Sequence, residues 1–233
     1  MQRLPGPRLA DVTMSCPTSH IEVEARLLDA ALPPNACVLD AGCGRTTRLT
    51  AHRDRISRLV GIDLDRTALA ENHGIDESVV GDLCEPLPFP DATFDAVYAN
   101  FVIEHLGAPG RAFTEWRRVL KPRGALIALT SNSANPLVAA SALLPERARV
   151  AIKRVGAGAV ERDVIPAHYR ANRLGRLDDL LRRSGFAPVD VVHAATLHRY
   201  MARAPRIEAA IRTIEGSLPA RLGATIVAWY AAI

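Results

Sequence analysis

Short apolar segments alternate with segments of helical periodicity along the first 130 residues. Nearly continuous apolar runs bounded by turn residues are typical of strands that are buried on both faces of a sheet. We predict five such strands, at residues 37–41, 58–63, 79–82, 94–100 and 125–130. Helices are predicted at residues 21–32, 66–72 and 111–120, with a further helix from the glycine-containing turn after the first strand to about residue 52.

This alternation predicts right-handed β-α-β units, and therefore an α/β fold with a mostly parallel sheet and helices on both faces. After residue 131 the regular alternation of strands and helices ends. We predict an apolar and basic helix from residue 137 to about 155, a loop at 156–166, a helix at 174–184 that ends at Gly185, a strand at 187–194, a helix at 207–218 and a last strand at 224–232.

The pattern predicts one domain over residues 21–233, with a lid-like insertion at about 133–170, after a flexible N-terminal segment at 1–20. The helix at 137–155 fits three roles, because its arginines alternate with apolar residues. It is interpreted first as a substrate lid, and otherwise as a dimer contact or a helix that lies on a membrane surface. A homodimer therefore stays open as the oligomeric state.

Composition narrows the class of protein. Hydrophobic residues make up 48% and charged residues 23% of the 233 residues, as in ordinary globular proteins. The net charge of +4 is spread along the chain, so a nucleic-acid partner is not expected. The four cysteines form no C-x-x-C pair, which favours a reducing cytoplasm and predicts no metal site. The N-terminus lacks the apolar region of a signal peptide, and we expect no integral membrane contact.

Ligands of open α/β sheets bind beyond the carboxyl ends of the strands, where the strand order reverses. Glycines at the first strand end let the backbone approach a ligand closely. Asp63, 21 residues after Gly42, stands where a carboxylate can accept both hydroxyl protons of a ribose. A single Asp at a strand end more often caps a turn, which is the alternative for Asp40 and Asp82. Several polar strand ends beside the glycine turn favour an adenosine-containing cofactor.

One position separates two classes of adenosine cofactor. A dinucleotide fingerprint, G-x-G-x-x-G, would require Gly or Ala at position 47, where this chain has Thr47. An NAD(P)-dependent oxidoreductase is thereby disfavoured but stays as an alternative function.

Six motifs in order resemble the class I S-adenosylmethionine-dependent methyltransferases, in the methyltransferase type 11-like branch that modifies small molecules such as quinones, sterols and natural products. The motifs are VLDAGCG at 38–44, GID at 61–63, GD at 81–82, LPFPDATFDAV at 87–97, EHL at 104–106 and RVLKPRG at 118–124. The resemblance is strong over about residues 36–132 and weaker through 168–170 and 174–186. One departure is Thr46, which stands where the family usually has a third glycine.

The resemblance implies a Rossmann-like seven-stranded sheet of order 3-2-1-4-5-7-6, whose last strand runs antiparallel between strands five and six. It implies S-adenosylmethionine as the cofactor and methyl transfer to O, N or C of a small-molecule acceptor. The residues it assigns to the cofactor are Asp40, Gly42, Cys43 and Gly44 for the methionine portion, Asp63 for the ribose, Leu64 for the adenine face, Asp82 and Leu83 for the adenine amino edge, and Asn100 for the floor near the sulfonium.

Methyl transfer is an in-line displacement that needs alignment of the reactants and exclusion of water, and it needs no metal. A hydroxyl acceptor benefits from a base, and His105, just past the fourth strand, is the first candidate. His168 and Tyr169 are the second candidates. His105 could instead order the following loop, and His168 could orient the substrate. A third alternative for the whole chain is a non-catalytic protein that binds the cofactor on the same fold.

Overall fold

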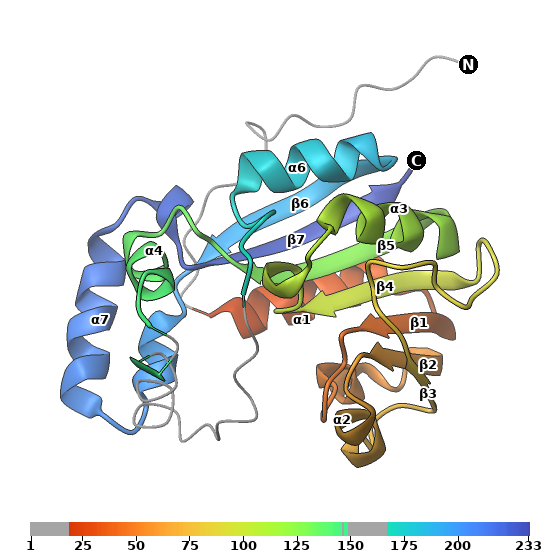
Figure 1. Ribbon diagram of the computed structural model, residues 1–233, viewed down its shortest axis with the longest axis horizontal. Helices are drawn as coiled ribbons and strands as arrows, with labels where there is room; N and C mark the ends of the chain where they lie inside the picture. The colour runs from red at the N-terminus through yellow and green to blue at the C-terminus, as the bar shows by residue number, and fades with distance from the viewer. Residues whose placement is uncertain (1–18, 146, 149–166) are drawn as a thin grey trace.

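The computed structural model describes residues 19–145, 147–148 and 167–233 (Figure 1). The predicted N-terminal segment lies outside these residues apart from its last two positions. The predicted loop at 156–166 and most of the lid-like insertion also lie outside them. The division into a single domain with a lid therefore stays a prediction.

Seven strands form one sheet in the order β3-β2-β1-β4-β5-β7-β6, which confirms the predicted fold class. The strands are β1 (Ala36–Ala41), β2 (Ile56–Asp63), β3 (Glu77–Val80), β4 (Phe94–Asn100), β5 (Leu120–Ser131), β6 (Phe186–Ala194) and β7 (Thr225–Ala232). Strands β1 to β5 pair in parallel, and β7 pairs antiparallel with both β5 and β6. The strand order reverses between β1 and β4, so a ligand is expected at the carboxyl ends of these two strands.

Helices cover both faces of the sheet (Figure 1). On one face, Leu27 and Leu28 of α1 (His20–Ala31) pack in a buried cluster with alternate strand residues such as Val38. On the other face, Trp116 of α3 (Pro109–Val119) and Leu177 of α6 (Leu174–Arg183) belong to the second buried cluster. Successive strand residues point to opposite faces, which is why the central strands are apolar almost throughout.

The remaining elements are short, apart from one helix. They are α2 (Arg66–Glu71), α4 (Pro136–Ala142), α7 (Pro205–Ser217) and the 3-10 turns η2 (Arg48–His52), η3 (Ile103–His105), η5 (Leu197–Met201) and η6 (Ala220–Leu222). Figure 1 shows α4 and α7 beyond one end of the sheet, away from β3. None of the helices in the described part of the chain is long and apolar enough to cross a membrane.

The helix predicted between the glycine turn and residue 52 is wrong. The structure has only the 3-10 turn η2 there, and residues 45–47 lie outside any helix. Thr47 has an extended backbone, and its side-chain oxygen accepts a 3.1 Å hydrogen bond from the amide of Leu49. Because Ser and Thr side chains compete with the helical backbone for such amides, Thr47 caps a late, short turn instead of continuing a helix.

The helix predicted over residues 137–155 is interrupted near its start. Helix α4 ends at Ala142, residues 143–145 lie outside any helix, and residues 147–148 are helical again. Proline lacks an amide hydrogen, and its ring disfavours the helical conformation of the preceding residue, here Leu144. The rest of the predicted helix, apart from residues 147–148, lies outside the described residues.

Most strands begin or end within two residues of their predicted bounds, and the differences at β3 and β5 matter most. Strand β3 ends at Val80, so Asp82 lies two residues beyond it in a turn. Strand β5 begins at Leu120, which was predicted as the last residue of the helix, and it includes residues 121–124, which were expected to separate helix and strand. Leu120 pairs with Phe94, and the register then shifts before Ala96 pairs with Ala125. Arg123, with a φ of 64°, lies within this irregular stretch.

The proline-rich loop between β3 and β4 is held by one arginine of α3. The Arg118 guanidinium donates to the main-chain oxygens of Leu87 and Phe89 at 2.9 and 2.8 Å, and it pairs with Asp91 at 2.8 Å and with Glu115 at 2.7 Å. Arg118 of α3 thus holds the loop before β4 in place, and it joins the motif at 118–124 to the motif at 87–97.

Candidate functional site

The glycine turn follows β1 directly and is held against the end of β2. The amides of Gly42 and Cys43 donate to the carbonyl of Ile62 at 2.8 and 3.3 Å. Gly42 and Gly44 have φ values of 75° and 54°, a region that glycine adopts without steric cost. A side-chain carbon added at Gly42 would lie 2.4 Å from Cγ2 of Val102, whereas one added at Gly44 would meet nothing within 4 Å. Gly42 is therefore required by packing, and Gly44 borders open space.

The carboxylate of Asp63 links the end of β2 to this turn. One oxygen accepts the amide of Gly44 at 2.9 Å, and the other accepts the amide of Asp65 at 2.9 Å. The next residue, Leu64, exposes 68% of its surface. Asp63 and Leu64 thus present a carboxylate and an apolar face next to the open side of Gly44.

Asp40 lies below the turn and is buried, with 2% of its surface exposed. Burial raises the pKa of its carboxyl to about 7; a hydrogen bond from Thr47 lowers it, and the charges of Asp63 and Glu24 raise it. Its Oδ2 atom has no hydrogen-bond partner among the described residues. The carboxyl can therefore donate or accept a hydrogen bond near neutral pH.

The sequence analysis missed a polar group beneath Asp40. Glu24 of α1 is buried, accepts hydrogen bonds from Nε of Arg48 at 2.9 Å, and also accepts the hydroxyl hydrogen of Tyr98. Burial raises the pKa of Tyr98 well above its usual range. A signal was available, because position 24 shares the apolar side of the helix with Val23, Leu27 and Leu28.

Three other residues predicted to bind the cofactor differ in their exposure: Asp82 is exposed, whereas Leu83 and Cys43 are buried. Asp82 is exposed, and its Oδ1 accepts the amide of Cys84 at 2.8 Å, the capping role that was the alternative reading of this residue. The side chain of Leu83 is 6% exposed and packs in the core, which leaves its main chain for any ligand. Cys43 is also buried, and burial raises the pKa of its thiol far above the usual range.

Asn100 ends β4, as predicted, and is half-buried. Its Oδ1 atom is buried without a hydrogen-bond partner among the described residues. β1 and β4 are neighbouring parallel strands, so Asn100 lies at the same sheet edge as Asp40 and the glycine turn. Buried polar atoms usually have hydrogen-bond partners, so these two oxygens at one sheet edge are acceptors left for a ligand that supplies donors.

The three residues predicted for acceptor chemistry come together at the adjoining strand ends. The main-chain oxygen of Glu104 accepts the amides of His168 and Tyr169 at 2.7 and 3.1 Å. His105 is the next residue in the chain and ends the turn η3. Residues more than 60 positions apart in the sequence therefore meet beyond β4 and β5.

The arrangement fits an adenosylmethionine-type ligand. The open side of Gly44 is a cradle that a side chain would fill, the Asp63 carboxylate faces it, and the unpartnered oxygens of Asp40 and Asn100 suit an ammonium group. Thr46, the departure from the glycine pattern, is exposed. Asp40, Gly42, Gly44, Asp63, Leu64 and Asn100 are thus the residues placed to hold such a ligand.

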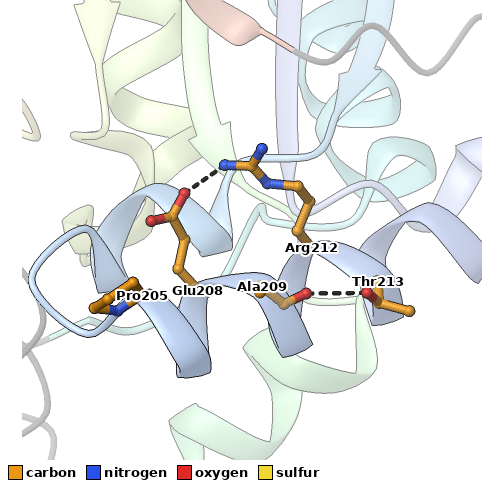
Figure 2. A pocket seen from close by; sticks show the side chains of 5 residues that line it. All are labelled: Pro205, Glu208, Ala209, Arg212 and Thr213. Carbon is orange, nitrogen blue, oxygen red and sulfur yellow. Dashed lines mark hydrogen bonds and ion pairs between the residues drawn. The ribbon is translucent and has the colours of Figure 1, made fainter.

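A shallow hollow on α7 lacks comparable chemistry (Figure 2). It is lined by five residues of this one helix, namely Pro205, Glu208, Ala209, Arg212 and Thr213. Figure 2 shows that Arg212 pairs with Glu208 and that the Thr213 hydroxyl bonds the carbonyl of Ala209. The polar groups are already satisfied within the helix, so the hollow offers no converging groups to a ligand.

Comparisons with known proteins bear on this geometry. Residues 39–128 match the family model described as "Methyltransferase domain". A malonyl-[acyl-carrier protein] O-methyltransferase of Erwinia pyrifoliae is 37% identical over 121 residues, which cover 49% of this chain and 46% of that protein. A "Probable S-adenosylmethionine-dependent methyltransferase" of Mycolicibacterium smegmatis is 31% identical over 172 residues, covering 71% of this chain and 59% of that one. The chain spans about half the length of the curated relatives it matches.

A solved structure agrees with the fold. An S-adenosylmethionine-dependent methyltransferase from Mesorhizobium loti superposes with a TM-score of 0.58 at 20% identity, covering 89% of this chain and 97% of that one. The sequence motifs, the strand order and the family match all indicate a methyltransferase domain. The chain is thus similar to the class I S-adenosylmethionine-dependent methyltransferases: residues 39–128 match the methyltransferase domain, and the sheet has the fold of a solved methyltransferase.

Proposed function

We propose that this protein transfers a methyl group from S-adenosylmethionine to an O, N or C atom of a small-molecule acceptor. The observation that carries the proposal is the open cradle at Gly44 beside the Asp63 carboxylate, with unpartnered oxygens of Asp40 and Asn100 at the same sheet edge. When bound, S-adenosylmethionine supplies an electrophilic methyl group on a sulfonium. The residues of the chain hold it, align the acceptor and exclude water.

Cofactor binding is divided among three strand ends. The backbone around Gly42 and Gly44 leaves room for the methionine portion, and the oxygens of Asp40 and Asn100 accept hydrogen bonds from its ammonium group. Asp63 has lone pairs left for two ribose hydroxyls after accepting the amides of Gly44 and Asp65. Leu64 covers one face of the adenine. These residues would hold the cofactor at the ends of β1, β2 and β4.

Acceptor activation depends on the acceptor atom. A hydroxyl or amine loses a proton on methylation, and His105 is the base that we place nearest the end of β4, with His168 and Tyr169 as the next choices. A carboxylate acceptor is already ionised at neutral pH and needs no base. The acyl-carrier-protein relatives are named for methylation at oxygen, which makes a carboxylic acid the first acceptor class to test.

The test is transfer of label from S-adenosyl-[methyl-³H]methionine to panels of carboxylic acids, phenols and amines, followed by chromatography of the products. We expect label in at least one product, and its loss in Asp63→Ala. Asp54→Ala, which removes an exposed carboxylate in the turn before β2, is the matched control and should transfer label normally. Binding of the cofactor without transfer to any panel or cell extract would favour a non-catalytic protein. Tight binding of NADH would favour an oxidoreductase.

Two further points stay predictions. We expect the protein to act in the cytoplasm and leave a homodimer open, and size-exclusion chromatography with light scattering decides the oligomeric state. The role of residues 133–170 as a lid is likewise a proposal, because most of this insertion lies outside the described residues.

A further inference from the structure

Glu104 joins two parts of the chain that are far apart in the sequence. Its carbonyl accepts the amides of His168 and Tyr169, and the Arg170 guanidinium donates to the carbonyl of Gly107. The segment at 167–172 is thereby fastened to the loop after β4 by main-chain contacts. Tyr169 has a φ of 52°, which is sterically disfavoured for an L-residue and persists where surrounding contacts impose it.

The Glu104 side chain fastens the same loop to the end of β5. It is 5% exposed, and its two oxygens accept the hydroxyl hydrogens of Thr130 and Ser131, each at 2.8 Å. Thr130 in turn accepts a 2.7 Å hydrogen bond from the Asn172 amide, which also donates to the Ser131 carbonyl at 3.0 Å. Thr130 and Asn172 are buried. The network therefore closes a ring from β5 through Glu104 and the 167–172 segment back to β5.

The same loop also touches the cofactor turn. The Val102 side chain occupies the place where a side chain of Gly42 would lie. Two residues later, Glu104 holds the segment that carries His168 and Tyr169. Apart from Asn100 at the end of β4, the proposed cofactor residues lie at the ends of β1 and β2, whereas Glu104, Thr130 and the 167–172 segment lie on the β4 and β5 side of the strand-order reversal. Under the proposed function, this second side is the acceptor side.

We propose that Glu104 is a positioning residue that sets His168 and Tyr169 at the acceptor side of the site, through its carbonyl and through its side-chain bonds to Thr130 and Ser131. This inference rests on the proposed function. Because Glu104 is buried and its side-chain oxygens accept the hydroxyls of Thr130 and Ser131, we assign it no direct contact with cofactor or acceptor. Its removal should therefore impair acceptor turnover while cofactor affinity is unchanged.

The first experiment measures amide hydrogen exchange of His168 and Tyr169 by NMR, together with the Kd for S-adenosylhomocysteine. We expect exchange of both amides to be at least about tenfold faster in Glu104→Ala, with Kd within about twofold of wild type. Glu104→Gln should restore protection, because its amide accepts one hydroxyl hydrogen and donates to the other oxygen. If Glu104→Ala fails to fold, Thr130→Val replaces it in the experiment. This variant removes the Thr130 hydroxyl and keeps the side-chain shape, and we expect it to weaken the protection of both amides.

Glu215→Gln is the matched control. Glu215 is equally buried, at 4% exposed, and accepts the amides of Thr196, Leu197 and His198 without contacting residues 167–172. It should leave the His168 and Tyr169 amides protected. Unchanged protection in Glu104→Ala, or a fall in cofactor affinity that accompanies it, would overturn the inference.

The second experiment uses the acceptor found by the label-transfer assay. Glu104→Ala should lower kcat/KM for that acceptor at least about tenfold and leave the Kd for S-adenosylhomocysteine unchanged, with recovery in Glu104→Gln. Wild-type turnover in Glu104→Ala would contradict the inference. If the wild type methylates nothing, the proposed function fails, while the exchange and affinity measurements still decide whether Glu104 positions the segment.

Discussion

Exchanging each glycine of the turn for alanine should separate packing from ligand binding. Gly42 and Gly44 both have positive φ values, so alanine is strained at either position. Only at Gly42 does the new carbon meet a neighbour, at 2.4 Å from Val102 Cγ2, whereas at Gly44 it points into open space. We predict that Gly42→Ala chiefly lowers stability and that Gly44→Ala chiefly lowers cofactor affinity.

The magnitudes follow from these two contacts. A left-handed alanine costs about 1–2 kcal/mol, partly offset by about 0.4–1 kcal/mol from the less flexible unfolded chain. Gly44→Ala should therefore lower the free energy of unfolding by about 1 kcal/mol or less. Overpacking against Val102 adds about 1–3 kcal/mol, so Gly42→Ala should lose about 1–4 kcal/mol. A carbon in the cradle at Gly44 should weaken binding of S-adenosylhomocysteine at least about tenfold, or about 1.4 kcal/mol.

Urea unfolding and calorimetric titration measure the two quantities. The double variant Gly42→Ala/Val102→Ala should recover the overpacking cost, about 1–3 kcal/mol, and keep the backbone strain. Equal stability losses in the two single variants would refute the packing argument. Unchanged affinity in Gly44→Ala would refute the assignment of the open space to the cofactor.

Three further predictions follow from named contacts. The pKa of the Asp40 carboxyl is raised to about 7 from its ordinary value of 3.8, so its contribution to stability is present below pH 3.8 and is lost as pH rises through about 7. The free energy of unfolding, measured at pH 5 and pH 8, should therefore show Asp40→Asn gaining stability relative to wild type as pH rises. A constant difference between the two proteins would contradict the raised pKa. Arg118→Ala should lower the free energy of unfolding by about 1.5–3 kcal/mol, because the carbonyls of Leu87 and Phe89 lose their donor. The control Arg111→Ala, which breaks an exposed ion pair with Glu85, should lower it by less than about 1 kcal/mol. Equal losses would show that the Arg118 contacts do not hold the loop. Leu64→Ala should change the free energy of unfolding by no more than about 0.5 kcal/mol and weaken S-adenosylhomocysteine binding about tenfold. The control Val189→Ala, at an exposed position of β6, should change neither quantity. Wild-type affinity in Leu64→Ala would show that Leu64 does not contact the cofactor.

The fold could be predicted because the signals are local. Continuous apolar runs such as Val38–Leu39 arise where both faces of a strand are covered, and Gly185, with a φ of 88°, ends its helix as predicted. The glycine turn, Asp63 and Asn100 lie at strand ends for the same reason, since the alternation of elements determines which residues end strands.

What could not be predicted depends on contacts between distant segments. Two wrong predictions are local exceptions, because the Thr47 hydroxyl caps a 3-10 turn through the amide of Leu49 and Pro145 follows the early end of α4, although apolar periodicity continues past both. The raised pKa of the Asp40 carboxyl could not be predicted, because it depends on the burial of Asp40 and on the charge of Glu24 beneath it. The meeting of His105, His168 and Tyr169 required Glu104 to bond segments more than 60 residues apart.

Calorimetric titration of the wild-type protein with S-adenosylhomocysteine tests the central claim most directly. The account predicts saturable binding at one site per chain, weakened at least about tenfold in Asp63→Ala and in Gly44→Ala, with no comparable binding of NADH. Absence of binding by the folded wild-type protein, or tight binding of NADH at the same turn, would contradict it.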